Sequence, residues 1–233
     1  CAVYHSPFNG AIMMRWFTLS LLVLVAGCNS HPRAADQAAS ADNPRPVVNS
    51  AERVQPLGVG QEAPQAAMRT PDGQTVSMDT IYRRMPTVLV FYRGGWCPYC
   101  NTQLSDLAQI EGELRRMGFQ IVAVSMDKPA ELRSTLDKSE VGYTLLSDAD
   151  AQLTRAFGLA FRVDQPTIEK YTTYGIDLEA ASGHDHHILP VPAIYLIDTA
   201  GMIHFAHWNP DYKARLSGQK VLEAAKQFDR TGG

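Results

Sequence analysis

Hydrophobic and polar residues follow two rhythms from about residue 55 onward, one typical of strands and one of helices. Residues 67–78 alternate around the turn signal Pro71-Asp72-Gly73, which predicts a β-hairpin. Residues 87–92 form a continuous apolar run, as expected of a strand that is buried on both faces. A helical pattern then begins at Asn101 and stops at Gly118. Its apolar positions are Leu104, Leu107, Ile110 and Leu114.

Strand and helix patterns continue to alternate along the rest of the chain. The expected strands are residues 119–125, 143–146, 193–198 and 202–208, and the expected helices are residues 129–138, 150–157 and 219–228. Interleaved strands and helices predict an α/β domain around a mostly parallel sheet. Residues 159–187 have little periodicity, and we interpret them as an insertion.

Composition divides the chain into three parts. Residues 1–27 contain an export signal, because Arg15 precedes an apolar stretch, residues 16–26, that is too short for a transmembrane span. Residues 28–54 are rich in Ala, Ser, Asn, Asp and Pro, which predicts a flexible tether. Residues 55–233 are long enough for one globular domain with a substantial core.

The signal ends in Val25-Ala26-Gly27-Cys28, which resembles the lipobox of bacterial lipoproteins. The resemblance implies that Cys28 carries a lipid and anchors the chain to a membrane, facing the periplasm. Asn29 resembles the residue found there in lipoproteins of the outer membrane. The alternative is an ordinary signal peptide whose cleavage site lies near a cysteine.

The balance of charged residues bears on whether the protein binds nucleic acid. The 21 Lys and Arg residues nearly balance the 24 Asp and Glu residues, and the sequence has no basic run. This balance argues against nucleic-acid binding. The sequence also has no nucleotide-binding fingerprint, so we expect no cofactor and predict that a protein supplies any reducing equivalents.

The clearest chemical motif is Cys97-Pro98-Tyr99-Cys100, between the apolar run and the first long helix. A helix N-terminus favours an anion, because its backbone N–H groups are unpaired and its dipole is positive there. A cysteine in that position has a lowered pKa and a reactive thiolate, so we predict a redox site. One alternative is a structural disulfide, but a disulfide that closes so short a loop contributes little to the stability of the fold. The other is half of a zinc site, for which only histidines remain as further ligands.

Three segments together resemble the peroxiredoxin-like branch of the alkyl hydroperoxide reductase and thiol-specific antioxidant family. They are residues 91–100 (Phe-Tyr-Arg-Gly-Gly-Trp-Cys-Pro-Tyr-Cys), residues 189–193 (Leu-Pro-Val-Pro-Ala), and Pro210-Asp211-Tyr212 with Arg215. The resemblance implies a thioredoxin-like fold: a central mixed β-sheet flanked by helices, an N-terminal β-hairpin, and the insertion before a cis-proline loop. That loop would hold Pro192 and face the cysteines. The resemblance also implies hydroperoxide reduction with a thioredoxin-like protein as the reductant.

The motif departs from the family's peroxidatic loop, Pro-x-x-x-Thr-x-x-Cys. On that loop Cys100 takes the place of the peroxide-attacking cysteine, Cys97 that of the threonine, and Arg93 that of the proline. The arginine that normally completes the site falls near Pro192. Such donors stabilise the departing oxyanion, and each contributes about 3 kcal/mol.

Two mechanisms therefore use the same sulfurs in opposite roles. In a peroxidase, which we place first, Cys100 attacks the peroxide and Cys97 converts the resulting sulfenic acid into a disulfide. In an oxidoreductase that acts on a protein disulfide, Cys97 is the exposed attacking thiol and Cys100 resolves the mixed disulfide. The position at the helix end favours Cys97 for a low pKa and for exposure.

Arg93 and Trp96, which precede the motif, have two interpretations each, and for Tyr99 only the docking role applies. Arg93 either supplies the missing positive charge or faces solvent at a strand end. Trp96 and Tyr99 form a docking surface for a partner, or Trp96 packs against the fold itself. Three other matches to the family have no evident chemistry and are interpreted as structural: Asp211, Tyr212 and Arg215.

A histidine-rich segment, residues 183–187, lies just before the Pro192 loop. With that loop facing the thiols, His187 would complete a copper(I) or zinc site with Cys97 and Cys100, and a copper-delivery protein is therefore a further alternative. The other interpretations are an exposed polar turn and a histidine that tunes the thiolate.

Overall fold

The computed structural model describes residues 44–139 and 141–230. The predicted export signal, the lipidation site Cys28 and most of the predicted tether lie outside these residues. Within the described part, no helix is both long enough and apolar enough to span a lipid bilayer.

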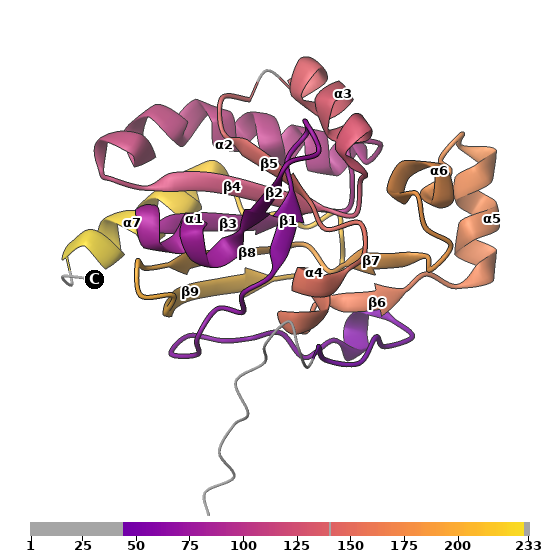
Figure 1. Cartoon of the computed structure of the whole chain (residues 1–233), viewed down its shortest axis with the longest axis horizontal. Coiled ribbons are helices and arrows are strands. Elements are labelled where there is room, and N and C mark those ends of the chain that lie inside the picture. Colours follow the sequence, from indigo (N-terminus) through magenta and orange to yellow (C-terminus); the bar gives the residue numbers. More distant parts are fainter. Residues whose placement is uncertain (1–43, 140, 231–233) are drawn as a thin grey trace, which may run out of the picture. The chain divides into compact units, whose positions relative to one another are not determined.

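A seven-stranded sheet lies at the centre of this part of the chain (Figure 1). Only β3 with β4 and β4 with β5 pair in parallel, and the other neighbouring strands of this sheet are antiparallel. The predicted mixed sheet is confirmed. The expectation of mostly parallel strands is wrong, because a hairpin contributes antiparallel strands at each edge. In spatial order the strands are β2 (Thr75–Ser77), β1 (Ala67–Arg69), β5 (Thr144–Ser147), β4 (Gln120–Ser125), β3 (Thr87–Phe91), β8 (Ala193–Ile197) and β9 (Ile203–Trp208).

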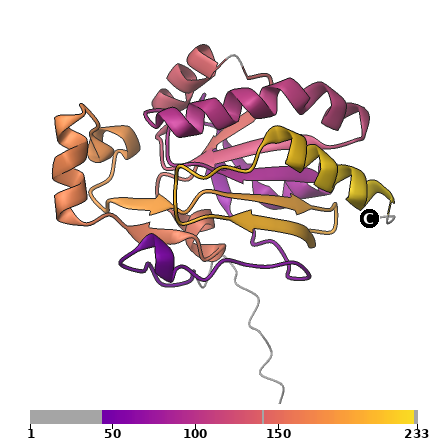
Figure 2. The same cartoon turned by 180° about the vertical axis from the view of Figure 1, so that it is seen from behind.

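Helices cover both faces of the sheet. On one face α2 (Pro98–Arg116) and α7 (Gly218–Arg230) pack side by side, with α3 (Pro129–Ser139) next to α2 (Figure 2). On the other face α1 (Met78–Arg84) and α4 (Gln152–Ala156) contribute buried side chains to a second core cluster. The strand β3 lies between the two clusters and is buried along its whole length, as its apolar run predicts.

The long helix α2 begins three residues before the predicted start at Asn101. Pro98 is its first residue and Cys97 is its N-cap. Proline is favoured at the first helical position, because its missing N–H is not needed there and its φ is already helical. The earlier start places Cys100 inside the first turn.

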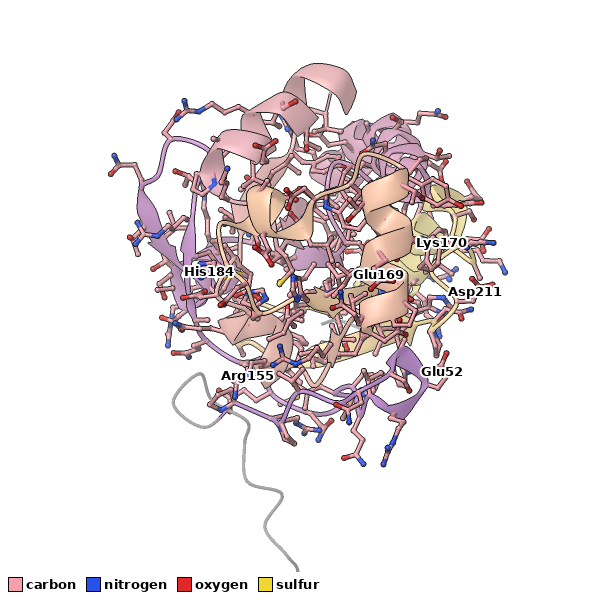
Figure 3. The ribbon with its side chains drawn as sticks, turned by 90° about the vertical axis from the view of Figure 1, so that its right-hand side faces the viewer. Glu52, Arg155, Glu169, Lys170, His184 and Asp211 are labelled. Atoms are coloured by element: carbon pink, nitrogen blue, oxygen red, sulfur yellow. The ribbon has the colours of Figure 1, made fainter. Side chains whose placement is uncertain are left out.

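The insertion is ordered, although its sequence shows little periodicity. It contains β6 (Ala160–Arg162), α5 (Gln165–Thr173) and α6 (Leu178–Ser182), and β7 (Ile188–Pro190), which follows it directly, pairs with β6 in a separate two-stranded sheet. Figure 3 looks onto α5, on which Glu169 and Lys170 are labelled. A third core cluster lies beneath these helices.

The ordered domain begins before the boundary expected at residue 55. The Val48 N–H donates to the Ala160 carbonyl at 3.3 Å, and the Arg162 N–H donates to the Val48 carbonyl at 2.8 Å. A short 3-10 helix, η1 (Ala51–Arg53), follows. The last residues of the predicted tether therefore pack on the insertion, and their small polar composition did not reveal this.

Candidate active site

The end of β3 brings the redox loop next to Pro192. Phe91, the last residue of β3, lies opposite Ala193, the first residue of β8, so the chain that leaves β3 toward the redox motif starts next to the chain that enters β8 from Pro192. Pro192 is buried and lines a cavity together with Arg93. Pro192 thus lies in the same cavity lining as Arg93 of the redox loop, while its facing the two cysteines and the cis geometry of its peptide bond stay predictions.

The loop between β3 and α2 is held from two sides. The Gly95 N–H donates to Asp127 Oδ2 at 2.7 Å, and Asn101 Nδ2 donates to the Gly95 carbonyl at 2.9 Å. Only glycine fits here, because a Cβ at position 95 would lie 1.9 Å from Thr135 Oγ1 of α3. These contacts set the direction in which the chain enters α2.

Cys97 and Cys100 are free thiols, so the structure shows the reduced dithiol. The Cys100 N–H donates to the Cys97 carbonyl at 3.0 Å, which closes the first turn of α2. Both side chains are buried, with exposed fractions of 1% for Cys97 and 0% for Cys100. The expectation that Cys97 is exposed is wrong, because side chains of the insertion and of the segment before α7 pack around the motif. Pro98, between the two thiols, is exposed.

The two thiols differ in acidity. Hydrogen bonding from Cys100 lowers the pKa of Cys97 to about 6, although burial acts to raise it. The charges of Arg93 and Arg215 also lower this pKa. Burial, followed by the interaction with Cys97, raises the pKa of Cys100 well above its usual range. Cys97 therefore carries the negative charge of the pair at neutral pH, as its position at the helix end predicts.

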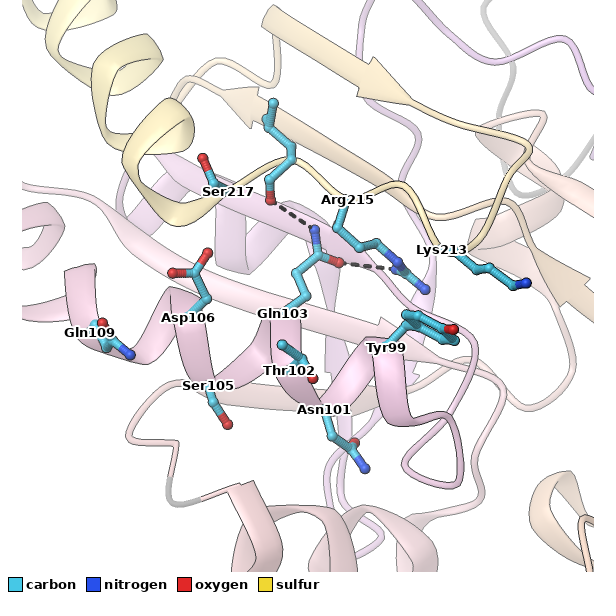
Figure 4. A pocket seen from close by; sticks show the side chains of 11 residues that line it. Tyr99, Asn101, Thr102, Gln103, Ser105, Asp106, Gln109, Lys213, Arg215 and Ser217 are labelled. Carbon is cyan, nitrogen blue, oxygen red and sulfur yellow. Dashed lines mark hydrogen bonds between the residues drawn. The ribbon is translucent and has the colours of Figure 1, made fainter.

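Arg215 contacts the dithiol directly. Its Nη2 donates to Cys100 Sγ at 3.3 Å, Nη1 donates to Gln103 Oε1 at 3.0 Å, and Nε donates to the Tyr212 carbonyl at 2.7 Å. Figure 4 shows the bond to Gln103, whose amide nitrogen also donates to the Leu216 carbonyl. The interpretation of Arg215 as structural is wrong. Its match to the family pattern was the one sequence feature that could have indicated a role at the site. The contact with Cys100 could not be predicted, because the two residues are 115 positions apart in the sequence.

Arg93 is buried among aromatic rings. Its guanidinium carbon lies 5.1 Å from the ring centroid of Trp96, 5.3 Å from that of Tyr171 and 4.2 Å from that of Tyr212. Its Nη2 donates to the Tyr171 hydroxyl. The alternative of a solvent-facing arginine is wrong, since only 3% of Arg93 is exposed. Its charge instead lowers the pKa of Cys97.

The two aromatic residues of the motif have different surroundings. Trp96 packs against Tyr171 of α5, with ring centroids 5.8 Å apart, so this side chain belongs to the fold's own packing. Tyr99 meets the Tyr212 ring edge-on at 5.7 Å and is 43% exposed. A docking role for the exposed face of Tyr99 stays a prediction.

Two cavities flank the motif. One has a volume of about 250 Å³ and is lined by Arg93, Tyr171 and Pro192 together with residues that precede β1. The other has a volume of about 970 Å³ and runs along α2, where Tyr99 and Arg215 line it (Figure 4). Each cavity is thus lined by one of the two guanidinium groups that lower the pKa of Cys97.

Asp127 is a further residue of the site, and the sequence analysis missed it. It follows β4, is 1% exposed and accepts the Gly95 N–H. Burial raises its pKa to about 7. With Trp96 it lines a third cavity of about 230 Å³. No feature of the sequence distinguishes this aspartate from the exposed ones.

The histidine-rich segment does not reach the thiols. His187 Nε2 pairs with Glu179 Oε1 at 2.9 Å, and His186 bonds the Ala149 carbonyl through Nε2 and the Ile188 N–H through Nδ1. In the described part of the chain, no three His, Cys, Asp or Glu side chains are arranged to hold a metal ion. The alternative site of His187 with Cys97 and Cys100 is therefore not formed in this structure.

Comparison with known proteins supports the resemblance on which the sequence analysis rests. The sequence model of the AhpC/TSA family matches residues 59–206, which is more than half of the chain. The chain belongs to the AhpC/TSA family. Curated relatives include a putative peroxiredoxin bcp of Haemophilus influenzae, 33% identical over 104 residues, and the peroxiredoxin Bcp of Escherichia coli K12, 32% identical over 104 residues. Each match covers 45% of this chain and 66% of the relative, just under two thirds of the relative's length.

Solved structures of the family share the fold. Peroxidoxin BcpB from Mycobacterium tuberculosis is 16% identical, with a TM-score of 0.59 over 76% of this chain and 99% of that one. Peroxiredoxin Q from Xanthomonas campestris is 20% identical, with a TM-score of 0.55 over 70% of this chain and 91% of that one. The predicted thioredoxin-like fold is confirmed, and at these identities the likeness concerns the fold alone.

Proposed function

We propose that this AhpC/TSA family member reduces hydroperoxides with the Cys97 and Cys100 dithiol, and that Cys97 is the attacking sulfur in place of Cys100, to which the family's loop pattern assigns that role, because the pKa of Cys97 is lowered and that of Cys100 is raised. One observation carries the proposal: Arg215 Nη2 lies 3.3 Å from the Cys100 sulfur, and hydrogen bonding from Cys100, aided by the charges of Arg93 and Arg215, lowers the pKa of Cys97. The thiolate is the nucleophilic form of cysteine. Positive groups placed beforehand around the sulfur stabilise the oxyanion that leaves when the O–O bond breaks.

The reaction balances with the two thiols alone. The Cys97 thiolate attacks the terminal oxygen of the hydroperoxide, the S–O bond forms, and the O–O bond breaks. Cys97 becomes a sulfenic acid, and the alkoxide takes up a proton and leaves as an alcohol. The Cys100 thiol then attacks the sulfenic sulfur, which forms the disulfide and releases water. An external dithiol restores both thiols by exchange.

Burial favours a hydroperoxide over a protein disulfide as the oxidant. Cys97 is 1% exposed. A hydroperoxide has the size of a few heavy atoms and needs only a small opening to reach a buried sulfur, whereas exchange with a protein disulfide needs the attacking sulfur at the surface. Thiol-disulfide exchange with Cys97 as nucleophile is therefore the second candidate, supported by the low pKa of this thiol.

Separate substitution of the two cysteines tests the proposal. Hydrogen peroxide is added to the reduced Cys100→Ser and Cys97→Ser proteins, a dimedone-type probe captures sulfenic acid, and mass spectrometry locates the label. We expect label on Cys97 in Cys100→Ser and little label on Cys100 in Cys97→Ser. The opposite distribution would make Cys100 the attacking sulfur. Absence of label in both proteins, together with a stable adduct of Cys97 with a protein disulfide, would favour exchange instead.

We propose that a thioredoxin-like protein reduces the disulfide. The chain carries no nucleotide-binding fingerprint, so electrons have to arrive through another thiol protein. The exposed Tyr99 ring lies between the two cysteines in sequence and is the natural first contact for that partner. Unchanged turnover with a thioredoxin in Tyr99→Ala would remove this role from Tyr99.

The sequence before the described residues suggests where the domain works. We propose that residues 1–27 are removed on export, that a lipid on Cys28 anchors the chain on the periplasmic side of a membrane, and that the following residues act as a tether. The support is the lipobox-like segment Val25-Ala26-Gly27-Cys28. Membrane fractionation tests it, because the Cys28→Ala protein is expected to leave the membrane fraction.

A further inference from the structure

One side chain links the insertion to the redox loop. Tyr171 lies on α5, its hydroxyl accepts a hydrogen bond from Arg93 Nη2, and its ring packs 5.8 Å from that of Trp96. Tyr171 itself is partly buried. The insertion therefore reaches the residues on either side of Gly94 and Gly95, just before Cys97.

Arg93 depends on these contacts for its position. Among the described residues, no carboxylate forms an ion pair with it. Its Nε has no hydrogen-bond partner, and its Nη2 bonds Tyr171. The rest of its surroundings are the rings of Trp96, Tyr171 and Tyr212. A buried guanidinium without a carboxylate is held by cation–π contacts and by neutral acceptors, and Tyr171 supplies one of each.

We propose that Tyr171 is a positioning residue, which acts through Arg93 to keep a positive charge beside the Cys97 sulfur. Its role in turnover rests on the proposed function, whereas its effect on the thiol does not require peroxide reduction. The insertion is then part of the redox site, and an α5 without this tyrosine would leave Arg93 free to turn toward the neighbouring cavity of about 250 Å³.

Several elements contribute groups that face Cys97. The titratable and charged ones are Cys100 of α2, Arg93 before α2, Arg215 before α7, Asp127 after β4, and Tyr171 of α5. Of these, Arg93 is hydrogen-bonded to Tyr171, and its charge lowers the pKa of Cys97. A substitution of Tyr171 is therefore expected to change the pKa of Cys97 through Arg93.

The pH profile of alkylation tests this role directly. The full-length Cys100→Ser chain is treated with iodoacetamide from pH 5 to pH 9, and the peptide that contains Cys97 is followed by mass spectrometry, because Cys1 and Cys28 also react. The variants are Tyr171→Phe, which loses only the hydroxyl, and Tyr171→Leu, which also loses the ring. Tyr174→Phe is the matched control on the same segment, since Tyr174 is 66% exposed.

In both Tyr171 variants, alkylation of Cys97 is expected to require a higher pH than in the parent, because an Arg93 that is less firmly held stabilises the Cys97 thiolate less. On the acid side of the profile the rate falls about threefold in Tyr171→Phe and about tenfold in Tyr171→Leu, the latter equal to a shift of about one pH unit. The control keeps the parent profile. A Tyr171→Phe profile that superimposes on the parent's would overturn the proposal, also in the event that Tyr171→Leu does not fold.

A double-substitution experiment separates positioning from a general loss of structure. If Tyr171 acts through Arg93, Tyr171→Phe has no further effect on the alkylation profile once Arg93 is replaced by Gln. An equal shift in the presence and absence of Arg93 would show that the tyrosine acts by another route. Both outcomes are read from the thiol alone, so they stay informative even if the protein proves not to reduce peroxides.

Discussion

Arg93 and Arg215 place two positive charges around one acidic thiol. Arg215 bonds the Cys100 sulfur and is fixed by Gln103 and the Tyr212 carbonyl, whereas Arg93 is held by aromatic rings. Both charges lower the pKa of Cys97. Neither occupies the sequence position near Pro192 at which the family pattern has its arginine, so the positive charges of this site come from other positions in the sequence.

Replacing Arg215 with Gln is expected to slow oxidation of the dithiol by hydrogen peroxide about a hundredfold, because the site loses a charged donor to the departing oxygen. Arg215→Lys keeps the charge but lacks the planar guanidinium that bonds Cys100 and Gln103 at the same time. Its oxidation rate should therefore lie between those of the parent and of Arg215→Gln. The rates are measured by stopped-flow mixing. Arg116→Gln, at an exposed position in the last turn of α2, serves as the control. A rate for Arg215→Gln equal to the parent's would remove Arg215 from the site.

Asp127 predicts a pH dependence of stability. Burial raises its pKa to about 7 in the folded protein, from the ordinary value of 3.8 that an aspartate has in the unfolded chain. Between these values the folded state binds more protons, so the free energy of unfolding falls as the pH rises from about 4 to about 7. The full effect is about 4 kcal/mol at most.

In Asp127→Asn this contribution is absent, because the amide has no proton to lose. Urea unfolding at pH 5 and pH 8 should therefore show the variant gaining stability relative to the parent at the higher pH. Asp229→Asn, at an exposed position, controls for the loss of a surface charge. A difference between Asp127→Asn and the parent that does not change with pH would contradict the raised pKa of Asp127.

At the scale of elements, the loop before α2 is clamped against α3. A Cβ on Gly95 would overlap Thr135 Oγ1, and this hydroxyl is itself held by a bond to the Glu131 carbonyl. We expect Gly95→Ala to lower the free energy of unfolding by about 1–3 kcal/mol. Adding Thr135→Ala removes the overlapping oxygen and should restore most of the loss. Chemical denaturation of the two single variants and the double variant checks this, and the absence of any recovery would place the strain elsewhere.

Periodicity predicted the elements that are long or buried on both faces. The strand β3 is a continuous apolar run, and the helix α2 has apolar positions that recur at helical spacing over most of its length. The helices and strands in and directly after the insertion escaped prediction because each spans only three to nine residues, too few for an amphipathic pattern to repeat. The early start of α2 was also missed, since a proline at the first helical position reads as a break unless its N-cap is recognised.

At the scale of the whole molecule, the site is assembled from distant parts of the sequence. The motif supplies Cys97 and Cys100, but Asp127 lies 32 positions from its partner Gly95, and Tyr171 lies 78 positions from Arg93. Such contacts depend on how the sheet and the insertion pack, and no local pattern reports them. The sequence could therefore locate the reactive sulfurs and their difference in acidity, while their burial and their charged neighbours needed the fold.

The most direct test is the rate at which the reduced full-length chain reacts with hydrogen peroxide, followed by tryptophan fluorescence with Trp96→Phe as the control for the origin of the signal. If the dithiol is a peroxidase site, oxidation is at least about a hundredfold faster than that of free cysteine at the same pH, the factor that one preorganised oxyanion donor supplies. A rate equal to that of free cysteine would contradict peroxide reduction and leave thiol-disulfide exchange as the function of this pair.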